Sequence, residues 1–209
     1  MILRALATIV LLALLALAFA LPSTSIGRRG SEPGARRDVE GMLDPGRALP
    51  SFELVGLDGR PVSGDELRGA PLLLVLERSI DWCPFTKMRL LQLREAFADT
   101  PDLRIVWVMS EAQISPRTRI FIDELGLGAR ILFLADPKSR LIRKLGLLKP
   151  DPEPIEKGVP HPTTLLLDRE GRVRFIDVRE DYHIWLDPST IARALQALES
   201  EPTAVGSPD

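Results

Sequence analysis

Short apolar runs alternate with stretches of helical spacing along the middle of the chain. The runs are almost purely aliphatic, which indicates strands that are buried on both faces of a sheet. Between them, large apolar residues recur every three or four positions, as in helices with one buried face. The predicted strands are 72–76, 103–109 and 131–135, and the predicted helices are 84–99, 116–125 and 138–145. This alternation predicts a parallel βαβ core with helices on both faces.

Two hairpins and a last helix complete the expected fold. The first hairpin has a Gly-Leu-Asp-Gly turn, and the second has a turn from Asp168 to Gly171. Their predicted strands are 52–55 with 61–62 and 163–167 with 172–178. A final helix is expected from Pro188 to Leu198. We therefore expect an α/β fold in which a central mixed β-sheet is flanked by helices and carries an N-terminal hairpin extension.

The first 22 residues form a separate hydrophobic segment. Arg4 precedes an uninterrupted apolar run that ends in Ala-Phe-Ala, which is the layout of a secretory signal peptide cleaved after Ala20. The alternative is a retained membrane anchor, because a run of about eighteen residues is at the lower limit for spanning a bilayer. Both interpretations predict an exported domain, in the periplasm or at the outer face of the cytoplasmic membrane. The second adds a membrane tether through residues 1–22.

The remaining chain is expected to form one domain with flexible ends. Residues 23–47 are rich in Ser, Gly, Pro, Arg and acidic residues and predict a disordered linker. Residues 48–199 form the expected domain, and 200–209 a flexible tail. The net charge of -2 gives no indication of nucleic-acid binding. With one cysteine and no Cys/His cluster at metal-ligand spacing, we expect no internal disulfide, no metal and no other cofactor.

The single cysteine, Cys83, lies where the first core strand gives way to a helix. Pro84 follows it, and proline is favoured in the first helical turn, so we expect the thiol at the positive end of the helix dipole. A free cysteine has a pKa near ~8.5, which helix N-termini and cations lower to roughly 3.5–7.5. Half ionisation at neutral pH needs about 2 kcal/mol, whereas a helix end typically supplies about 0.3–1 kcal/mol. A reactive Cys83 therefore needs a second stabilising group; the alternative is an inert buried cysteine.

Two motifs together carry a family resemblance. DWCPFT opens a helix directly after a strand, and GVPHPTTLLLDREGRV follows later in the chain. The chain resembles the thioredoxin superfamily, and within it the redoxin branch of the alkyl hydroperoxide reductase/thiol-specific antioxidant type, which includes a peroxiredoxin-like group. The resemblance covers 49–198 and implies a thioredoxin-like fold with Cys83 as the nucleophile. It also implies that Pro162 is the cis-proline that faces this nucleophile.

The sequence departs from these relatives around the cysteine. Thr86 stands where they have a second cysteine, so two-cysteine thiol–disulfide exchange is excluded. The positions of the peroxiredoxin threonine and proline hold Ile80 and Leu76. Cys83 alone can still attack a peroxide, giving a sulfenic acid, or a disulfide, giving a mixed disulfide. The Thr86 hydroxyl is a candidate donor to the sulfur, and simple replacement of a lost cysteine is the alternative.

These features predict an exported, peroxiredoxin-like oxidoreductase with one reactive cysteine. Its substrate is expected to be a peroxide or a disulfide, and its partner an external thiol reductant or a thiol/disulfide protein. Two alternatives follow from the missing cysteine and threonine: a non-catalytic thioredoxin-like binding or scaffold domain, and an envelope redox sensor that uses Cys83 as a reversible switch.

His161 directly precedes Pro162 and is the candidate for the second stabilising group. In a thioredoxin-like fold its loop lies beside Cys83, where a protonated imidazole favours the thiolate. We predict that His161→Ala slows alkylation of Cys83 at neutral pH and moves the alkylation profile to higher pH. An unchanged profile would remove His161 from the mechanism.

Overall fold

The described part of the chain is built on one mixed sheet. The computed structural model describes residues 6, 8–14, 16, 43–150 and 157–201. Seven strands lie in the order β2-β1-β5-β4-β3-β6-β7. They are β1 (Glu53–Gly56), β2 (Pro61–Ser63), β3 (Leu72–Glu77), β4 (Arg104–Met109), β5 (Ile131–Ala135), β6 (Thr163–Leu167) and β7 (Val173–Val178). The central strands β3, β4 and β5 are parallel, and all other neighbouring pairs are antiparallel.

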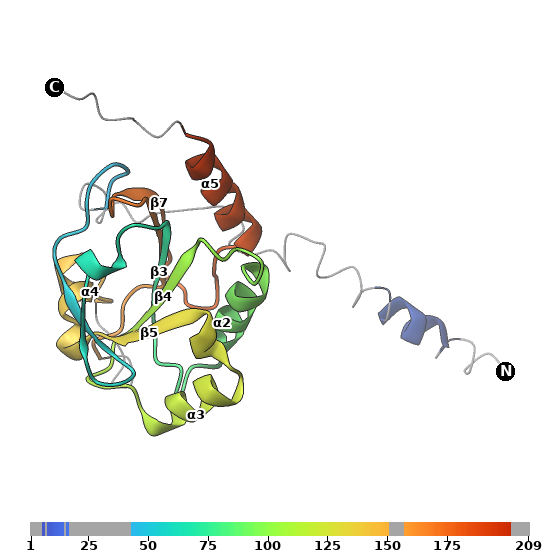
Figure 1. The fold of residues 1–209 in the computed structure, drawn as a ribbon. Helices are drawn as coiled ribbons and strands as arrows, with labels where there is room; N and C mark the ends of the chain where they lie inside the picture. Colours follow the sequence, from blue (N-terminus) through green and yellow to red (C-terminus); the bar gives the residue numbers. More distant parts are fainter. Residues whose placement is uncertain (1–5, 7, 15, 17–42, 151–156, 202–209) are drawn as a thin grey trace.

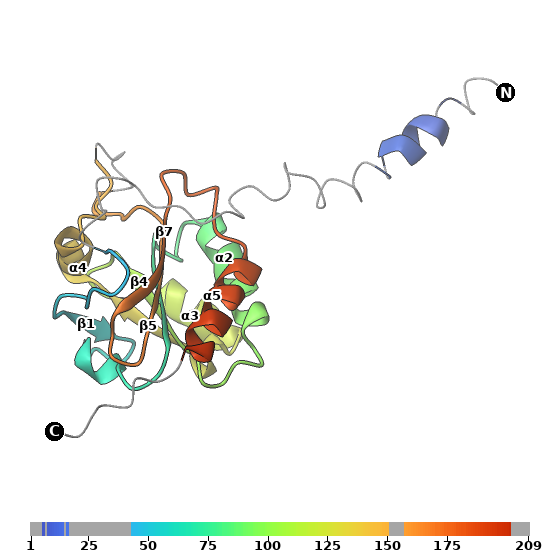
Figure 2. The ribbon, with the colours of Figure 1, turned by 90° about the horizontal axis from the view of Figure 1, so that it is seen from above.

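Helices cover both faces of this sheet. The α-helices are α2 (Pro84–Ala96), α3 (Pro116–Glu124), α4 (Arg140–Lys144) and α5 (Pro188–Ser200), and the short 3-10 turns are η2 (Asp65–Leu67), η3 (Leu127–Ala129) and η4 (Pro137–Ser139). Figure 2 shows α2, α3 and α5 on one side of the sheet and α4 on the other, and Figure 1 shows the same division. The expected thioredoxin-like α/β fold, including the N-terminal hairpin β1–β2, is confirmed.

The alternation of side chains along β3 separates two apolar clusters. Leu73 and Val75 belong to the cluster that contains side chains of α2, α3 and α5. Leu74 and Leu76 belong to the cluster that contains side chains of α4. Because both faces are covered, the strand is apolar at every position up to its end. Glu77 continues the series of Leu73 and Val75, so its carboxylate points toward the α2 layer.

Several local signals in the sequence correspond to observed turns and caps. Ser115 caps α3 by accepting a hydrogen bond from the backbone N–H of Thr118 at 3.1 Å. Gly146 follows α4 with a φ of 68°, the left-handed conformation of a C-terminal glycine. The Gly171 N–H donates to the Asp168 carbonyl at 3.0 Å and closes the turn between β6 and β7.

The helix expected over 138–145 is shorter, because its first residues leave the helical conformation. Lys138 and Ser139 adopt φ values of 62° and 51°, an uncommon pair for residues other than glycine. The Ser139 hydroxyl donates to the Gly158 carbonyl at 2.6 Å. A Cβ on Gly158 would lie 2.8 Å from this hydroxyl oxygen. The loop before β6 is therefore held against the start of α4.

The observed domain is slightly longer than the expected 48–199. Leu43 is buried among side chains of the α4 face, and the Gly46 N–H donates to the Val173 carbonyl at 2.6 Å. The last five residues of the expected 23–47 linker therefore pack against the fold, because Leu43 supplies an apolar side chain. Ser200, expected in the tail, belongs to α5.

Most of the predicted N-terminal segment lies outside the described residues, as do the rest of the linker and residues 202–209 of the tail. Residues 6, 8–14 and 16 are helical. Among the helices of the described residues, none combines the length and the apolar character needed to cross a membrane. The signal peptide and the anchor both stay predictions.

Candidate active site

Cys83 is the N-cap residue of α2, as the sequence predicts. It has an extended conformation (φ -95°, ψ 109°), and Pro84 occupies the first helical position. The Cys83 N–H donates to the Ser79 carbonyl at 3.2 Å, and the Cys83 carbonyl accepts from the Lys87 N–H at 3.3 Å. The residue is only 2% exposed. Its thiol therefore lies at the positive end of a 13-residue helix, shielded from bulk solvent.

The His161–Pro162 segment reaches the same edge of the sheet. The β3–β6 ladder ends with Leu76 opposite Thr163, so the segments beyond this pair, toward Cys83 and toward Pro162, leave the sheet together. The Pro162 carbonyl accepts from the Arg179 N–H at 2.9 Å, and the His161 N–H donates to Leu147 at 2.8 Å. The topology thus brings the two predicted segments to one edge, and the role of His161 in ionising Cys83 stays a prediction.

The expected cis conformation of Pro162 is not observed. No peptide bond among the described residues is cis, so the His161–Pro162 bond is trans. The expectation came from the resemblance alone, and the trans form is the ordinary preference of an X–Pro bond by about 0.5–1 kcal/mol.

Thr86 takes part in a buried polar cluster that lies next to Cys83 along α2. Its hydroxyl donates to Glu77 Oε2 at 3.5 Å. Arg89, one turn further along α2, forms an ion pair with the other Glu77 oxygen and donates to the Thr164 hydroxyl. A hydroxyl has a single proton, so in this structure the Thr86 proton is directed to Glu77 and not to the Cys83 sulfur, which was one of the two alternatives for this residue.

A second buried ion pair lies on the same face of the sheet. Asp177 is opposite Thr164 in the β6–β7 ladder, so both side chains lie on one face. Arg179 contacts the two Asp177 oxygens at 2.7 and 2.9 Å. Buried charges are tolerated where they are paired and hydrogen-bonded, and the strand ends below the cysteine are therefore polar as well as buried.

Aromatic side chains surround the start of α2. The Phe85 ring packs edge-on against Tyr182 and His183, at 5.6 and 4.4 Å between centroids. The Arg78 guanidinium stacks on Tyr182 at 3.7 Å and on Trp82 at 4.6 Å. The segment around Tyr182 thus contacts Arg78 and Phe85, on either side of Cys83 in the sequence.

Ser79 connects this turn to the neighbouring strand. Its hydroxyl accepts from the Asp81 N–H at 3.1 Å and donates to a carboxylate oxygen of Glu111, two residues beyond β4. Burial raises the pKa of the Glu111 carboxyl, the nearby charge of Asp81 adds to this, and hydrogen bonds from Ser79 and the Ser115 backbone act in the opposite direction. The site thus contains a carboxyl group that holds its proton more tightly than an exposed glutamate does.

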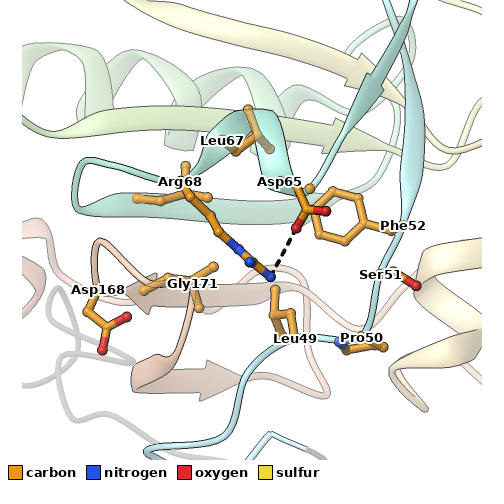
Figure 3. A pocket seen from close by; sticks show the side chains of 12 residues that line it. Leu49, Pro50, Ser51, Phe52, Asp65, Leu67, Arg68, Asp168 and Gly171 are labelled. Atoms are coloured by element: carbon orange, nitrogen blue, oxygen red, sulfur yellow. Dashed lines mark ion pairs between the residues drawn. The ribbon is translucent and has the colours of Figure 1, made fainter. Parts of the chain in front are cut away.

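A small cavity lies at the opposite end of β3, away from Cys83. Its walls include Leu72 and Leu167, which pair at the far end of the β3–β6 ladder. Figure 3 shows an ion pair between two of the residues that line it, Arg68 and Asp65, whose charged atoms lie 3.0 Å apart. This cavity contains none of the predicted site residues. Within the described residues, no three His, Cys, Asp or Glu side chains are grouped so that they could hold a metal ion.

Comparisons with known proteins agree with this geometry. The AhpC/TSA family model matches residues 45–176, more than half of the chain. The chain belongs to the AhpC/TSA family. A sequence comparison with curated proteins gives no match.

Solved structures of redox proteins share the fold of this family member. A thiol peroxidase from Chromobacterium violaceum has a TM-score of 0.66 at 23% identity, over 76% of this chain and 89% of the other. A peroxiredoxin-like protein from Aquifex aeolicus has a TM-score of 0.66 at 16% identity, over 77% and 90%. A putative thiol:disulfide interchange protein from Chlorobium tepidum has a TM-score of 0.53 at 22% identity, over 75% and 98%. At these identities the likeness shows the fold alone.

The buried Arg89–Glu77 pair generates a stability prediction. Arg89→Met leaves the Glu77 charge buried without its cation, so we expect the free energy of unfolding to fall by about 3–5 kcal/mol in urea titrations. The double variant Glu77→Leu/Arg89→Met removes both charges and should recover part of this loss. Arg94→Met is the control: Arg94 is half-buried near the end of α2 and donates one hydrogen bond to the Leu125 carbonyl, so its loss should cost about 1 kcal/mol. An Arg89 variant no less stable than this control would contradict the prediction.

Proposed function

We propose that this AhpC/TSA family member is an exported thiol oxidoreductase with one reactive cysteine, and that its first substrate is a peroxide. The observation that carries the proposal is the position of Cys83 at the N-cap of α2. Backbone N–H groups and the helix dipole favour a thiolate there. The reactive form is the thiolate, so this position supplies the nucleophile that the reaction needs.

The burial of Cys83 favours a peroxide over a protein disulfide. With 2% of the residue exposed, a disulfide carried on a second protein cannot bring its own sulfur into line for attack without a movement of α2. A hydroperoxide reacts through a terminal oxygen atom and needs far less space.

The reaction can be written with the residues present. The Cys83 thiolate attacks one peroxide oxygen; the S–O bond forms as the O–O bond breaks, and the leaving oxygen takes up a proton as water or an alcohol. Cys83 is oxidised to a sulfenic acid and the peroxide is reduced. Because Thr86 cannot form a disulfide, an external thiol attacks the sulfenic sulfur and releases water. A second thiol then frees Cys83 and leaves as a disulfide.

Consumption of hydroperoxide in the presence of dithiothreitol tests this proposal. The wild-type protein should accelerate it in proportion to protein concentration, and Cys83→Ser should reduce the rate to that of the thiol alone. Dimedone should label Cys83 after addition of peroxide, as seen by mass spectrometry. If the protein turns over a protein disulfide faster than the peroxide, its substrate is a disulfide and not a peroxide. If it turns over neither, the proposal that it is an enzyme is wrong.

A non-catalytic binding domain is the second candidate, and the same burial of Cys83 favours it. In that case Cys83 reacts with iodoacetamide no faster than a free cysteine, and the Cys83→Ser variant keeps every binding property of the protein. The alkylation rate, measured beside the peroxide assay, therefore separates the two functions.

Export is the other part of the proposal and is supported by the layout of residues 1–22. We predict that the protein recovered from cells is found outside the cytoplasm. N-terminal sequencing should give Leu21 as the first residue if the segment is a cleaved signal peptide. A retained Met1 in the membrane fraction would identify an anchor, and a full-length protein in the cytoplasm would contradict export.

A further inference from the structure

Ser79 holds the turn that presents Cys83. Its carbonyl accepts the Cys83 N–H at 3.2 Å, and its hydroxyl accepts the Asp81 N–H at 3.1 Å. One residue therefore holds the backbone on either side of Trp82, through its side chain at Asp81 and through its carbonyl at Cys83. Since the hydroxyl already accepts from Asp81, its own proton remains for a third partner.

Glu111 is that third partner, and the sheet brings it there. β3 and β4 are parallel with Glu77 beside Met109, so the same register carried two residues further places Ser79 beside Glu111. The Ser79 hydroxyl donates to Glu111 Oε1. The other oxygen, Oε2, is buried and has no hydrogen-bond partner among the described residues. The Ser79 hydroxyl on the turn and the Ser115 backbone at the start of α3 both act on this carboxyl group.

We propose that Glu111 is a positioning residue for Cys83, acting through Ser79. This inference deepens the proposed function and rests on it only in taking Cys83 as the reacting group. The chain of contacts runs from Glu111, two residues beyond β4, through the Ser79 hydroxyl to the backbone N–H of Asp81, and the Ser79 carbonyl accepts the backbone N–H of Cys83. It anchors the turn before α2 to a strand that does not carry the cysteine. Loss of either side chain frees the turn and moves the thiol relative to the helix end.

The charge of Glu111 adds a pH dependence to this role. The charged groups on the elements around it include Asp81 on the turn, and Arg119 on α3, which donates to the carbonyls of Leu57 and Ile114. Burial raises the pKa of the Glu111 carboxyl. As the pH rises through that raised value, Glu111 becomes negative beside the turn, and a negative charge there disfavours the thiolate.

Alkylation of Cys83 by iodoacetamide, followed as a function of pH in the full-length protein, tests the proposal. Glu111→Gln and Glu111→Ala both remove the charge, but only glutamine keeps an oxygen acceptor for Ser79. We expect the glutamine variant to react about tenfold faster than the alanine variant, the ratio that corresponds to one lost hydrogen bond to the turn. In both variants the plot of alkylation rate against pH should lose the inflection that Glu111 adds in the wild type.

Further variants keep the test decisive. Ser79→Ala, which removes the link and keeps the carboxylate, should slow alkylation about tenfold relative to the wild type. Glu170→Gln, in the β6–β7 turn at the other end of the sheet, is the control and should match the wild type. Far-UV circular dichroism and a cooperative thermal transition establish that each variant is folded. If a Glu111 variant is not folded, the comparison of Ser79→Ala with the wild type decides the test.

The outcomes separate this inference from the proposed function. Equal rates for Glu111→Gln and Glu111→Ala, or a Ser79→Ala rate equal to that of the wild type, would overturn the positioning role. Peroxide reduction by the wild type alongside such equal rates leaves the proposed function standing. The expected alkylation series without any turnover of peroxide or disulfide leaves the positioning role standing and removes the function.

Discussion

Glu77 and Arg89 form a buried ion pair that ties the end of β3 to the middle of α2. Neither charge has access to water, and separating them would leave a cost of several kcal/mol per ion. The helix is therefore restricted to positions and rotations that keep the pair intact. Because Cys83 is the cap of that same helix, the ion pair also determines where the sulfur lies relative to the sheet. The hydrogen bonds from Thr86 and to Thr164 extend this restraint to the first turn of α2 and to β6.

Thr86, the residue three positions after Cys83, is part of this cluster. Thr86 is buried and hydrogen-bonded to Glu77, so its side chain fills this position in the first turn of α2. In the proposed reaction the reducing equivalents therefore come from another molecule. The shielding of Cys83 limits which molecules reach it first, whereas the aromatic side chains around the start of α2, with Trp82 36% exposed, form the outer surface that any such molecule meets.

The fold could be predicted from the sequence because its central strands are buried on both faces and read as continuous apolar runs. Cys83 and the segment before β6 could be placed from their motifs and from strand order. The buried polar cluster could not be predicted from the sequence. Glu77 and Arg89 are twelve positions apart, and they look like ordinary surface charges until the packing of α2 against β3 is known. The one available signal was a carboxylate that directly continues an apolar strand. The left-handed conformation at positions 138 and 139 could not be predicted, because neither residue is a glycine or an asparagine. The cis form of Pro162 was taken from the resemblance alone and was wrong.

The loop that contains His161 is attached to the opposite layer from Cys83. Ser139, at the start of α4, holds the Gly158 carbonyl, and Leu147, just beyond α4, holds the His161 backbone. The cysteine moves with α2, across the sheet from α4. A local unwinding of the first turn of α2 would therefore carry the sulfur outward while the histidine remained behind. The predicted influence of the His161 imidazole on the thiolate would then be lost in the same step that exposes Cys83 to a bulky reductant.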